Sequence, residues 1–320
     1  MYRNLDRDDL AAIDCFCKGI AAGKTSIDIP FEASIDRIMF LYKACFSYHP
    51  ELVSVNNCHI SVRQGIGRST VNIKRKNAWN VIRGTHKDFG DEEVRYLSRF
   101  AFDTVKKLGL TDMSPFWKVI KIYDYLVTTV TYRDADCAHD AWGALIDRKA
   151  VCEGIAYAFC LLGRAAGLEV IKVSGFLDGG SHAWNMVKIY GKTYHLDATN
   201  DLQNSDFNNS YSRLFLSDSD MVNYVWDRNL YAPCTSNQHN YFIITDSFAN
   251  NRSDAVRIMK RQFSGGHTVY LRCHKSYRPD FDEISDIFRE AFKDSYHGSV
   301  RWTTTLDEVM NIIKIEYHKY

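Results

Sequence analysis

The sequence has few prolines, no long apolar run and no excess of charge of either sign. Only 5 of its 320 residues are proline, whereas 19 are tyrosine and 18 are phenylalanine, and this composition argues against extended disorder. No stretch approaches the roughly 18 apolar residues that a membrane-spanning helix requires, so we expect no membrane insertion. The formal net charge of +1 provides no global field that would favour binding to nucleic acid.

The first residues and the cysteines both indicate a reducing compartment. The N-terminal sequence MYRNLDRDDLAAIDCFCKGIAAG has acidic residues where a signal peptide needs a basic start and a continuous apolar stretch. We expect a cytoplasmic protein, or a secreted or cell-surface one if a signal peptide has been removed. The nine cysteines are scattered and form no pair of C-x-x-C units, so we expect no structural zinc site. Most of them are expected to be small buried hydrophobic residues.

The pattern of helices and strands divides the chain into three segments. Residues 1–85 are predicted to be a small α/β unit that includes a hairpin formed by CHISVRQ and STVNIKR. Residues 86–238 have helical patterns first and strand patterns later. Residues 239–320 predict a second small α/β unit, in the order strand YFIIT, helix SDAVRIMKRQF, strand HTVYLRC, helix FDEISDIFREAF and strand IIKIEYHKY.

The central segment contains three predicted helices followed by three strands. The first helix is GDEEVRYLSRFAFDTVKKLG, and the second is SPFWKVIKIYDYLVTTVTY, with Ser114 as N-cap and Pro115 at the first helical position. The third helix begins at Cys152, in RKAVCEGIAYAFCLLGRAAG. The strands VIKVSGF, AWNMVKIYG and KTYHLDAT follow, and the short GK between the last two predicts a tight turn.

Cys152 lies where a loop becomes a helix. The positive end of the helix dipole and the unpaired N–H groups there favour the thiolate form of a cysteine, and the thiolate is the nucleophile. Cys160 lies two turns further along and has neither advantage, so we expect it in the core. The structural alternative for Cys152 is also packing, which is the usual role of an isolated cysteine.

A thiolate enzyme needs a base, and His182 in GGSHAWNMV is the most suggestive histidine. It follows two glycines and opens a strand whose alternate residues are apolar. Asp197, in YHLDAT on the next strand, can orient the imidazole. In an antiparallel hairpin with its turn near Gly191, we expect Asp197 opposite His182 to within one residue. Taken alone, the histidine also fits a satisfied polar residue and the aspartate also fits a turn former.

The segments AWGALIDRKAVCEGIAYAFCLLGRAAGLEVIKVSGF and SHAWNMVKIYGKTYHLDATND resemble the transglutaminase-like superfamily, in particular its bacterial members. The resemblance covers residues from about 115 to 220 and rests on a VC-x-G helix, the HAWN motif and a strand ending in LD-x-T. The segments YSRLFLSDSDM and YHPELVSV also resemble parts of such bacterial proteins. The resemblance implies an α+β fold with a papain-like core. In that core the nucleophile helix packs on an antiparallel sheet, here flanked by small α/β units.

The resemblance also implies roles for individual residues. It makes Cys152 the nucleophile, His182 the general base and acid, and Asp197 the residue that orients His182. Trp142, in AWGAL, lies where family members often place an aromatic near the oxyanion site, although a core aromatic is an equal alternative. Trp184 is expected to shape the cleft rather than to take part in the chemistry.

His195 shares a strand face with Asp197, so it is a weaker second candidate for the cleft. Glu153 is expected to be a first-turn acid favoured by the helix dipole.

The implied activity is acyl transfer from a peptide or glutamine-type amide through a thioester, with a protein or peptide as substrate. Resolution by water would make a peptidase or amidase, which we favour. Resolution by an amine would make a transglutaminase, and a deamidase acting on glutamine or a non-catalytic binding module are further alternatives. Eukaryotic transglutaminases carry calcium-binding loops, but no D-x-[DN]-x-[DN]-G loop occurs here, and DGG at 178–180 predicts a hairpin turn. We therefore expect no metal requirement and no cofactor.

Overall fold

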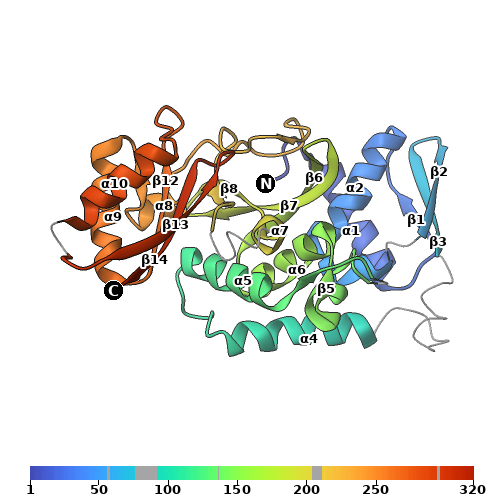
Figure 1. Cartoon of the computed structure of the whole chain (residues 1–320). Coiled ribbons are helices and arrows are strands. Elements are labelled where there is room, and N and C mark those ends of the chain that lie inside the picture. Colours follow the sequence, from blue (N-terminus) through green and yellow to red (C-terminus); the bar gives the residue numbers. More distant parts are fainter. Residues whose placement is uncertain (56–57, 76–91, 136, 204–210, 294–295) are drawn as a thin grey trace.

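The computed structural model describes most of the chain and shows an α+β protein. Helices and strands gather along its length into an N-terminal part, a central part and a C-terminal part (Figure 1). The described residues are 1–55, 58–75, 92–135, 137–203, 211–293 and 296–320.

The N-terminal part contains two helices, a strand and the hairpin that the sequence predicted. Its α2 helix begins after Ser34, whose side chain accepts a hydrogen bond from the backbone N–H of Arg37, as an N-cap should. Its three strands form an antiparallel sheet in the order β1-β3-β2. The elements are α1 (Arg7–Ala21), β1 (Ser26–Ile29), α2 (Ile35–Tyr48), η1 (Pro50–Val55), β2 (Cys58–Gly65) and β3 (Arg68–Arg75).

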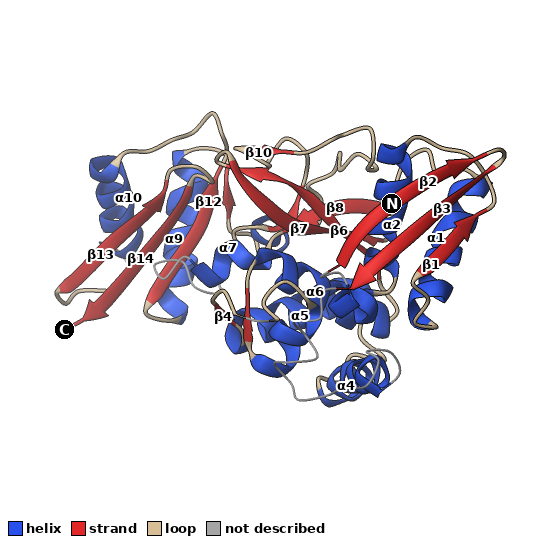
Figure 2. Cartoon of the chain, turned by 90° about the vertical axis from the view of Figure 1, so that its right-hand side faces the viewer, coloured by secondary structure: helices blue, strands red, loops and turns tan. Residues whose placement is uncertain are grey.

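The central part places three helices on one side of a five-stranded antiparallel sheet (Figure 2). The helices are α4 (Glu92–Lys107), α5 (Pro115–Thr129) and α6 (Cys152–Ala165). Pro115 opens α5 as predicted, but the Ser114 hydroxyl makes no capping hydrogen bond. The sheet has the order β10-β6-β7-β8-β9, with β6 (Glu169–Leu177), β7 (Gly180–Ile189), β8 (Lys192–Leu196), β9 (Leu214–Leu216) and β10 (Tyr224–Val225). Shorter elements are β4 (Thr131–Tyr132), η2 (Gly143–Asp147), β5 (Lys149–Ala150) and α7 (Ala198–Gln203).

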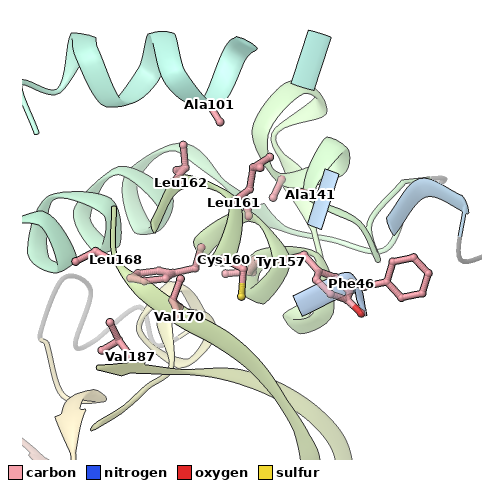
Figure 3. Packing of buried hydrophobic residues seen from close by; sticks show 14 of the residues in the cluster. Phe46, Ala101, Ala141, Tyr157, Cys160, Leu161, Leu162, Leu168, Val170 and Val187 are labelled. Atoms are coloured by element: carbon pink, nitrogen blue, oxygen red, sulfur yellow. The ribbon is translucent and has the colours of Figure 1, made fainter. Parts of the chain in front are cut away.

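Helix α6 is buried on almost every side. All ten residues from Gly154 to Gly163 are buried, and Cys160 is among them, as predicted. Figure 3 shows the side chains of Tyr157, Leu161 and Leu162 among residues from neighbouring elements. The helix is therefore fixed firmly enough to present its first residue in one position.

The central hairpins turn where backbone conformations of positive φ allow it. Asp178 and Gly179 have φ values of 50° and 79° and join β6 to β7, which confirms the turn predicted at DGG. Tyr190 and Gly191, with φ values of 49° and 75°, join β7 to β8. The turn is one residue earlier than the predicted GK, since Lys192 already pairs in β8.

This turn fixes a register that differs from the predicted one. Asn185 pairs with Leu196, so the continuation of the ladder would place Asp197 opposite Trp184. The prediction that Asp197 lies opposite His182 to within one residue is wrong, because the true partner is two residues away. His182 pairs instead with Gly175 of β6.

The C-terminal part is a mixed four-stranded sheet with two long helices. YFIIT is not a strand as predicted, because Asn240 caps a short helix there and only Phe242 of that helix is buried. The strand over Val300–Asp307 was missed. The sheet has the order β11-β12-β14-β13, and the elements are α8 (Tyr241–Ile244), β11 (Phe248–Ala249), α9 (Arg252–Gly265), β12 (Thr268–Cys273), α10 (Phe281–Lys293), β13 (Val300–Asp307) and β14 (Ile312–Lys319).

Three hydrophobic clusters hold the chain together. The first extends from Ala12 to Phe215 and so joins N-terminal residues to the central helices. The second lies within the C-terminal part, and the third covers the sheet face that includes Trp184. The proposed division at 85 and 86 lies outside the described residues, and the three-unit division stays a prediction. None of the helices in the described ranges is long and apolar enough to cross a membrane.

Candidate active site

Cys152 is the first residue of α6 and is partly exposed. The preceding Val151 is extended, with φ −97° and ψ −180°, so the chain changes direction abruptly at the cysteine. Gly154 allows the loop before the helix to pass close by, since a Cβ at this position would lie 2.2 Å from the carbonyl oxygen of Ala138. The loop and the helix start are therefore fixed against each other next to the thiol.

His182 connects this thiol to a carboxylate. Its Nε2 lies 2.7 Å from Oδ2 of Asp197, and the Cys152 side chain is near enough to help raise its pKa. Because Asp197 engages Nε2, Nδ1 is the ring nitrogen left for the sulfur. The structure thus brings together the three residues that the sequence singled out.

The shifted register does not separate His182 from Asp197. Asp197 follows the last residue of β8, and its ladder position would face Trp184, two residues from His182. Side chains two residues apart on a strand point to the same face, so the two groups are diagonal neighbours, which lie within reach of long side chains. A slip of one residue would have placed the carboxylate on the opposite face.

The Asp197 carboxylate is 1 % exposed and is fully hydrogen-bonded. Oδ1 accepts from the backbone N–H of Thr199 at 3.0 Å, and Oδ2 accepts from the hydroxyl of Tyr224 at 2.6 Å as well as from His182. Burial alone would raise the pKa of Asp197, but the His182 charge and these hydrogen bonds lower it below its usual value. Tyr224, on β10, was not identified from the sequence, because no motif links this short distant strand to the hairpin.

His182 is the most perturbed member of the group. Burial lowers its pKa, but Asp197 and then Cys152 outweigh that effect and raise the pKa to about 10. The imidazole is therefore protonated at neutral pH. The protonated ring lies beside the sulfur and can act as a proton donor there.

The Trp184 ring packs against the His182 ring. The two rings are stacked with centroids 6.0 Å apart and an interplanar angle of 19°. The indole N–H of Trp184 donates to Nδ1 of His195 at 3.0 Å, and Nε2 of His195 lies 2.8 Å from Oδ1 of Asp218. Trp184 is almost fully buried, so its place is the wall behind the histidine.

The prediction that His195 lies in the cleft is wrong. His195 is 0 % exposed, because the Trp184 ring and Asp218 enclose it. Burial lowers the pKa of His195 despite the carboxylate, so the ring is neutral.

One group of side chains lies close enough together to be a candidate metal site, namely His195, Asp218 and Cys234. Their ligand atoms all lie within 4.8 Å of one another. However, Nδ1 of His195 accepts the indole proton of Trp184, so the neutral ring must carry its own proton on Nε2, the nitrogen that faces Asp218. That nitrogen has no lone pair to offer a cation, and this hydrogen-bond pattern does not fit a metal ligand.

Trp142 ends the turn before η2 and packs against the first hydrophobic cluster. Its ring contacts that of Tyr96 on α4, with centroids 5.6 Å apart. This contact agrees with the packing alternative, and a place near the oxyanion site stays a prediction.

A partly buried ion pair lies next to the nucleophile. Glu153, the residue after Cys152, accepts from the Lys172 ammonium at 2.7 Å and lies 3.4 Å from Nδ1 of His139. Lys172 is buried and lies 4.5 Å from the centre of the Tyr157 ring. Although burial would raise it, the pKa of Glu153 is lowered by Lys172 and His139. Glu153 is therefore more than a first-turn acid, since it ties α6 to β6.

With this geometry established, comparisons identify what the core is similar to. Residues 103–198 match the model of the transglutaminase-like superfamily. The match covers under a third of the chain and includes Cys152, His182 and Asp197. No curated protein among those compared matches the chain significantly.

Solved structures of low sequence identity match parts of the chain with low TM-scores. A crystal structure of a TGase matches with 18% identity and a TM-score of 0.33, over 56% of this chain. A candidate cysteine protease from Cytophaga hutchinsonii matches with 17% identity and a TM-score of 0.28, over 45% of this chain. A candidate protease from Parabacteroides distasonis matches with 12% identity and a TM-score of 0.27, over 44%. The chain spans 52%, 62% and 36% of these three proteins, respectively.

Proposed function

We propose that this chain, which carries a transglutaminase-like core, is a cysteine-dependent enzyme that cleaves peptide or glutamine-type amides. The observation that carries the proposal is the position of His182, which is hydrogen-bonded to the buried carboxylate of Asp197 and lies close enough to Cys152 for that thiol to help raise its pKa. Such an arrangement supplies a nucleophile, a proton carrier and a group that orients the carrier.

In the proposed reaction, the Cys152 sulfur attacks the amide carbonyl carbon and the C–N bond breaks. His182 gives its Nδ1 proton to the departing amine, and a thioester remains on Cys152. Water then attacks the thioester, and His182 takes a proton from it, which regenerates the starting state. Asp197 stays ionised throughout and holds Nε2–H of His182.

The alternative is resolution of the thioester by an amine, which would make the protein a transglutaminase. The same three residues serve both outcomes, so we base our preference for hydrolysis on the absence from the sequence of the calcium-loop motif. A deamidase that releases ammonia from glutamine is a hydrolytic variant of the same chemistry. A non-catalytic binding module is disfavoured, because such a module would not need a protonated histidine held between a thiol and a buried carboxylate.

Selective labelling tests the nucleophile. A thiol-reactive electrophile should label Cys152 of the folded chain faster than the other cysteines, and His182→Gln should slow this labelling by at least about tenfold. Cys15→Ala is the matched control, because Cys15 is also partly exposed but belongs to α1. Equal labelling of Cys15 and Cys152 would reject the proposed nucleophile.

A second experiment distinguishes the reactions by which the thioester could be resolved. The chain is incubated with a mixture of unfolded proteins and a tagged primary amine, with Cys152→Ala as the inactive control. New amino termini would support a peptidase, and ammonia release without new termini would support a deamidase. Incorporation of the tag that depends on Cys152 would overturn our preference for hydrolysis.

A further inference from the structure

A second pair of cysteines lies in the N-terminal part, on two packed helices. Cys17 of α1 and Cys45 of α2 are both buried, and their Sγ atoms are 2.8 Å apart. Non-bonded heavy atoms pack best at roughly 3.5–4.0 Å, whereas a disulfide bond is about 2.05 Å long. The two sulfurs are therefore already within reach of a bond.

The same pair has its own histidine and carboxylate. His49 follows α2, and its backbone N–H donates to the carbonyl of Cys45 at 2.8 Å, which fixes its position relative to the pair. Its Nδ1 lies 2.9 Å from Oε1 of Glu51, and its side chain is near enough to that of Cys17 to lower the pKa of this thiol. This repeats, with different residues, the arrangement of thiol, imidazole and acid found around Cys152.

The surroundings distinguish the two sulfurs. The hydrogen bond between the Cys17 and Cys45 thiols, and then the neighbouring His49, lower the pKa of Cys17 to about 6 despite burial. The hydrogen bond to Cys17 and burial raise the pKa of Cys45. The hydrogen bonds with Cys17 and Glu51 raise the pKa of His49 to about 10. A thiolate beside an imidazolium, with a thiol held next to it, is the arrangement of an attacking and a resolving cysteine.

Access to this site favours a small reactant. Cys17 is only 8 % exposed. The His49 side chain is 46 % exposed, and together with Glu51 it lines a pocket of about 200 Å³ that residues of α4 and α6 complete. Neither sulfur lines this pocket, so the proposed approach past His49 suits only a reactant as small as a hydroperoxide, and a protein substrate cannot reach the buried sulfur.

We propose that Cys17 and Cys45 are an oxidation site at which a hydroperoxide converts the two thiols into a disulfide that links α1 to α2. This inference does not depend on the proposed amidase function, because it uses none of the residues around Cys152.

The reaction balances with the groups present. The Cys17 thiolate attacks the outer oxygen of the hydroperoxide, the O–O bond breaks, and His49 gives its proton to the departing alkoxide, so that an alcohol and a sulfenic acid form. The Cys45 thiol then attacks the Cys17 sulfur, the S–O bond breaks, and the thiol proton leaves with the hydroxyl group as water. Two sulfurs are oxidised by one hydroperoxide, which is reduced to an alcohol and water.

The test uses the full chain with Cys152→Ser, so that the candidate active site cannot compete for oxidant. The reduced protein is treated with hydrogen peroxide, its remaining thiols are blocked in denaturant, and its peptides are mapped by mass spectrometry without reduction. The expected product is a linked pair of peptides containing Cys17 and Cys45. Its absence, or its formation only in denaturant, would overturn the proposal.

Further variants test the assigned roles in the same background. Adding Cys45→Ser should leave a sulfenic acid on Cys17 that dimedone traps, and trapping on Cys15 instead would contradict the assignment. His49→Gln should slow disulfide formation by about tenfold, because the thiolate of Cys17 loses its cationic partner. Cys15→Ser, two residues earlier on the same helix, should leave the rate unchanged. A rate that His49→Gln does not alter would reject the role of the imidazole.

Discussion

Replacing Asp197 by asparagine tests how the candidate site works. In the structure, Oδ1 of Asp197 accepts from the backbone N–H of Thr199, while Oδ2 accepts from His182 and Tyr224. In the variant, the amide oxygen must stay opposite the Thr199 N–H, since two donors cannot face each other. The new NH₂ group then points to Nε2 of His182, which must become an acceptor. The ring proton therefore moves to Nδ1, the nitrogen that has to take protons.

The size of the effect follows from the pKa of His182. Its value of about 10 exceeds the ordinary value of about 6.5, although burial works in the opposite direction, and Asp197 is the largest cause of the rise. Return to the ordinary value would correspond to about 4–5 kcal/mol of lost stabilisation of the imidazolium. Together with the wrong tautomer, we expect amide cleavage to fall by roughly 10³–10⁴-fold in Asp197→Asn.

Two measurements check this reasoning without knowledge of the natural substrate. NMR titration of the His182 ring should show a pKa several units lower in Asp197→Asn. The rate at which an electrophile labels Cys152 at neutral pH should also fall, while Asp218→Asn, which alters the partner of the buried His195, serves as a matched control. An unchanged pKa of His182, or labelling within about twofold of the original rate, would refute the role assigned to Asp197.

The remaining predictions concern groups that support the site. Tyr224→Phe removes a hydrogen bond to the buried Asp197 carboxylate, so we expect about 1.5–3 kcal/mol lower stability in urea unfolding. The pKa of Asp197 should also rise measurably. Gly154→Ala should abolish labelling of the nucleophile, because the new Cβ would collide with the Ala138 carbonyl, whereas Gly265→Ala, with nothing within 4 Å, should be tolerated. The raised pKa of His182 gives a contribution to stability that is complete below about pH 6.5 and is lost as the pH rises through about 10. The stability difference between the original chain and His182→Gln should therefore shrink between these pH values, and a difference that grows with pH would contradict this sign.

The helices and hairpins with strong local patterns were predictable. The helix at Cys152 was expected from its apolar periodicity, and the turn at Asp178 from its DGG sequence. The segment at Tyr241 misled the prediction, because a short run of apolar residues fits a strand and a helix equally well, and only the cap at Asn240 and tertiary packing decide between them. The strand at Val300–Asp307 was missed because its stability comes from pairing with β14.

The candidate site, too, was predictable from the sequence only in part. The residue types and their order along the chain were enough to single out Cys152, His182 and Asp197, because a thiol at a helix start and an acid on the next strand of a hairpin are local features. The tertiary structure corrected the register between the strands and placed Tyr224 on the carboxylate. It also moved His195 out of the cleft, since burial depends on which elements cover a strand face.

The sequence by itself determined most of the elements, the similarity of residues 103–198 to the transglutaminase-like superfamily and the three residues of the candidate site, because periodicity, capping and turn chemistry act over a few neighbouring residues. Only the tertiary structure decided which side chains of the candidate sites come into contact. The contacts between His182 and Cys152 and between Cys17 and Cys45 join residues about thirty positions apart in the chain. Their distances, and hence the raised and lowered pKa values, depend on how helices pack on each other and on the sheet, which local patterns do not specify.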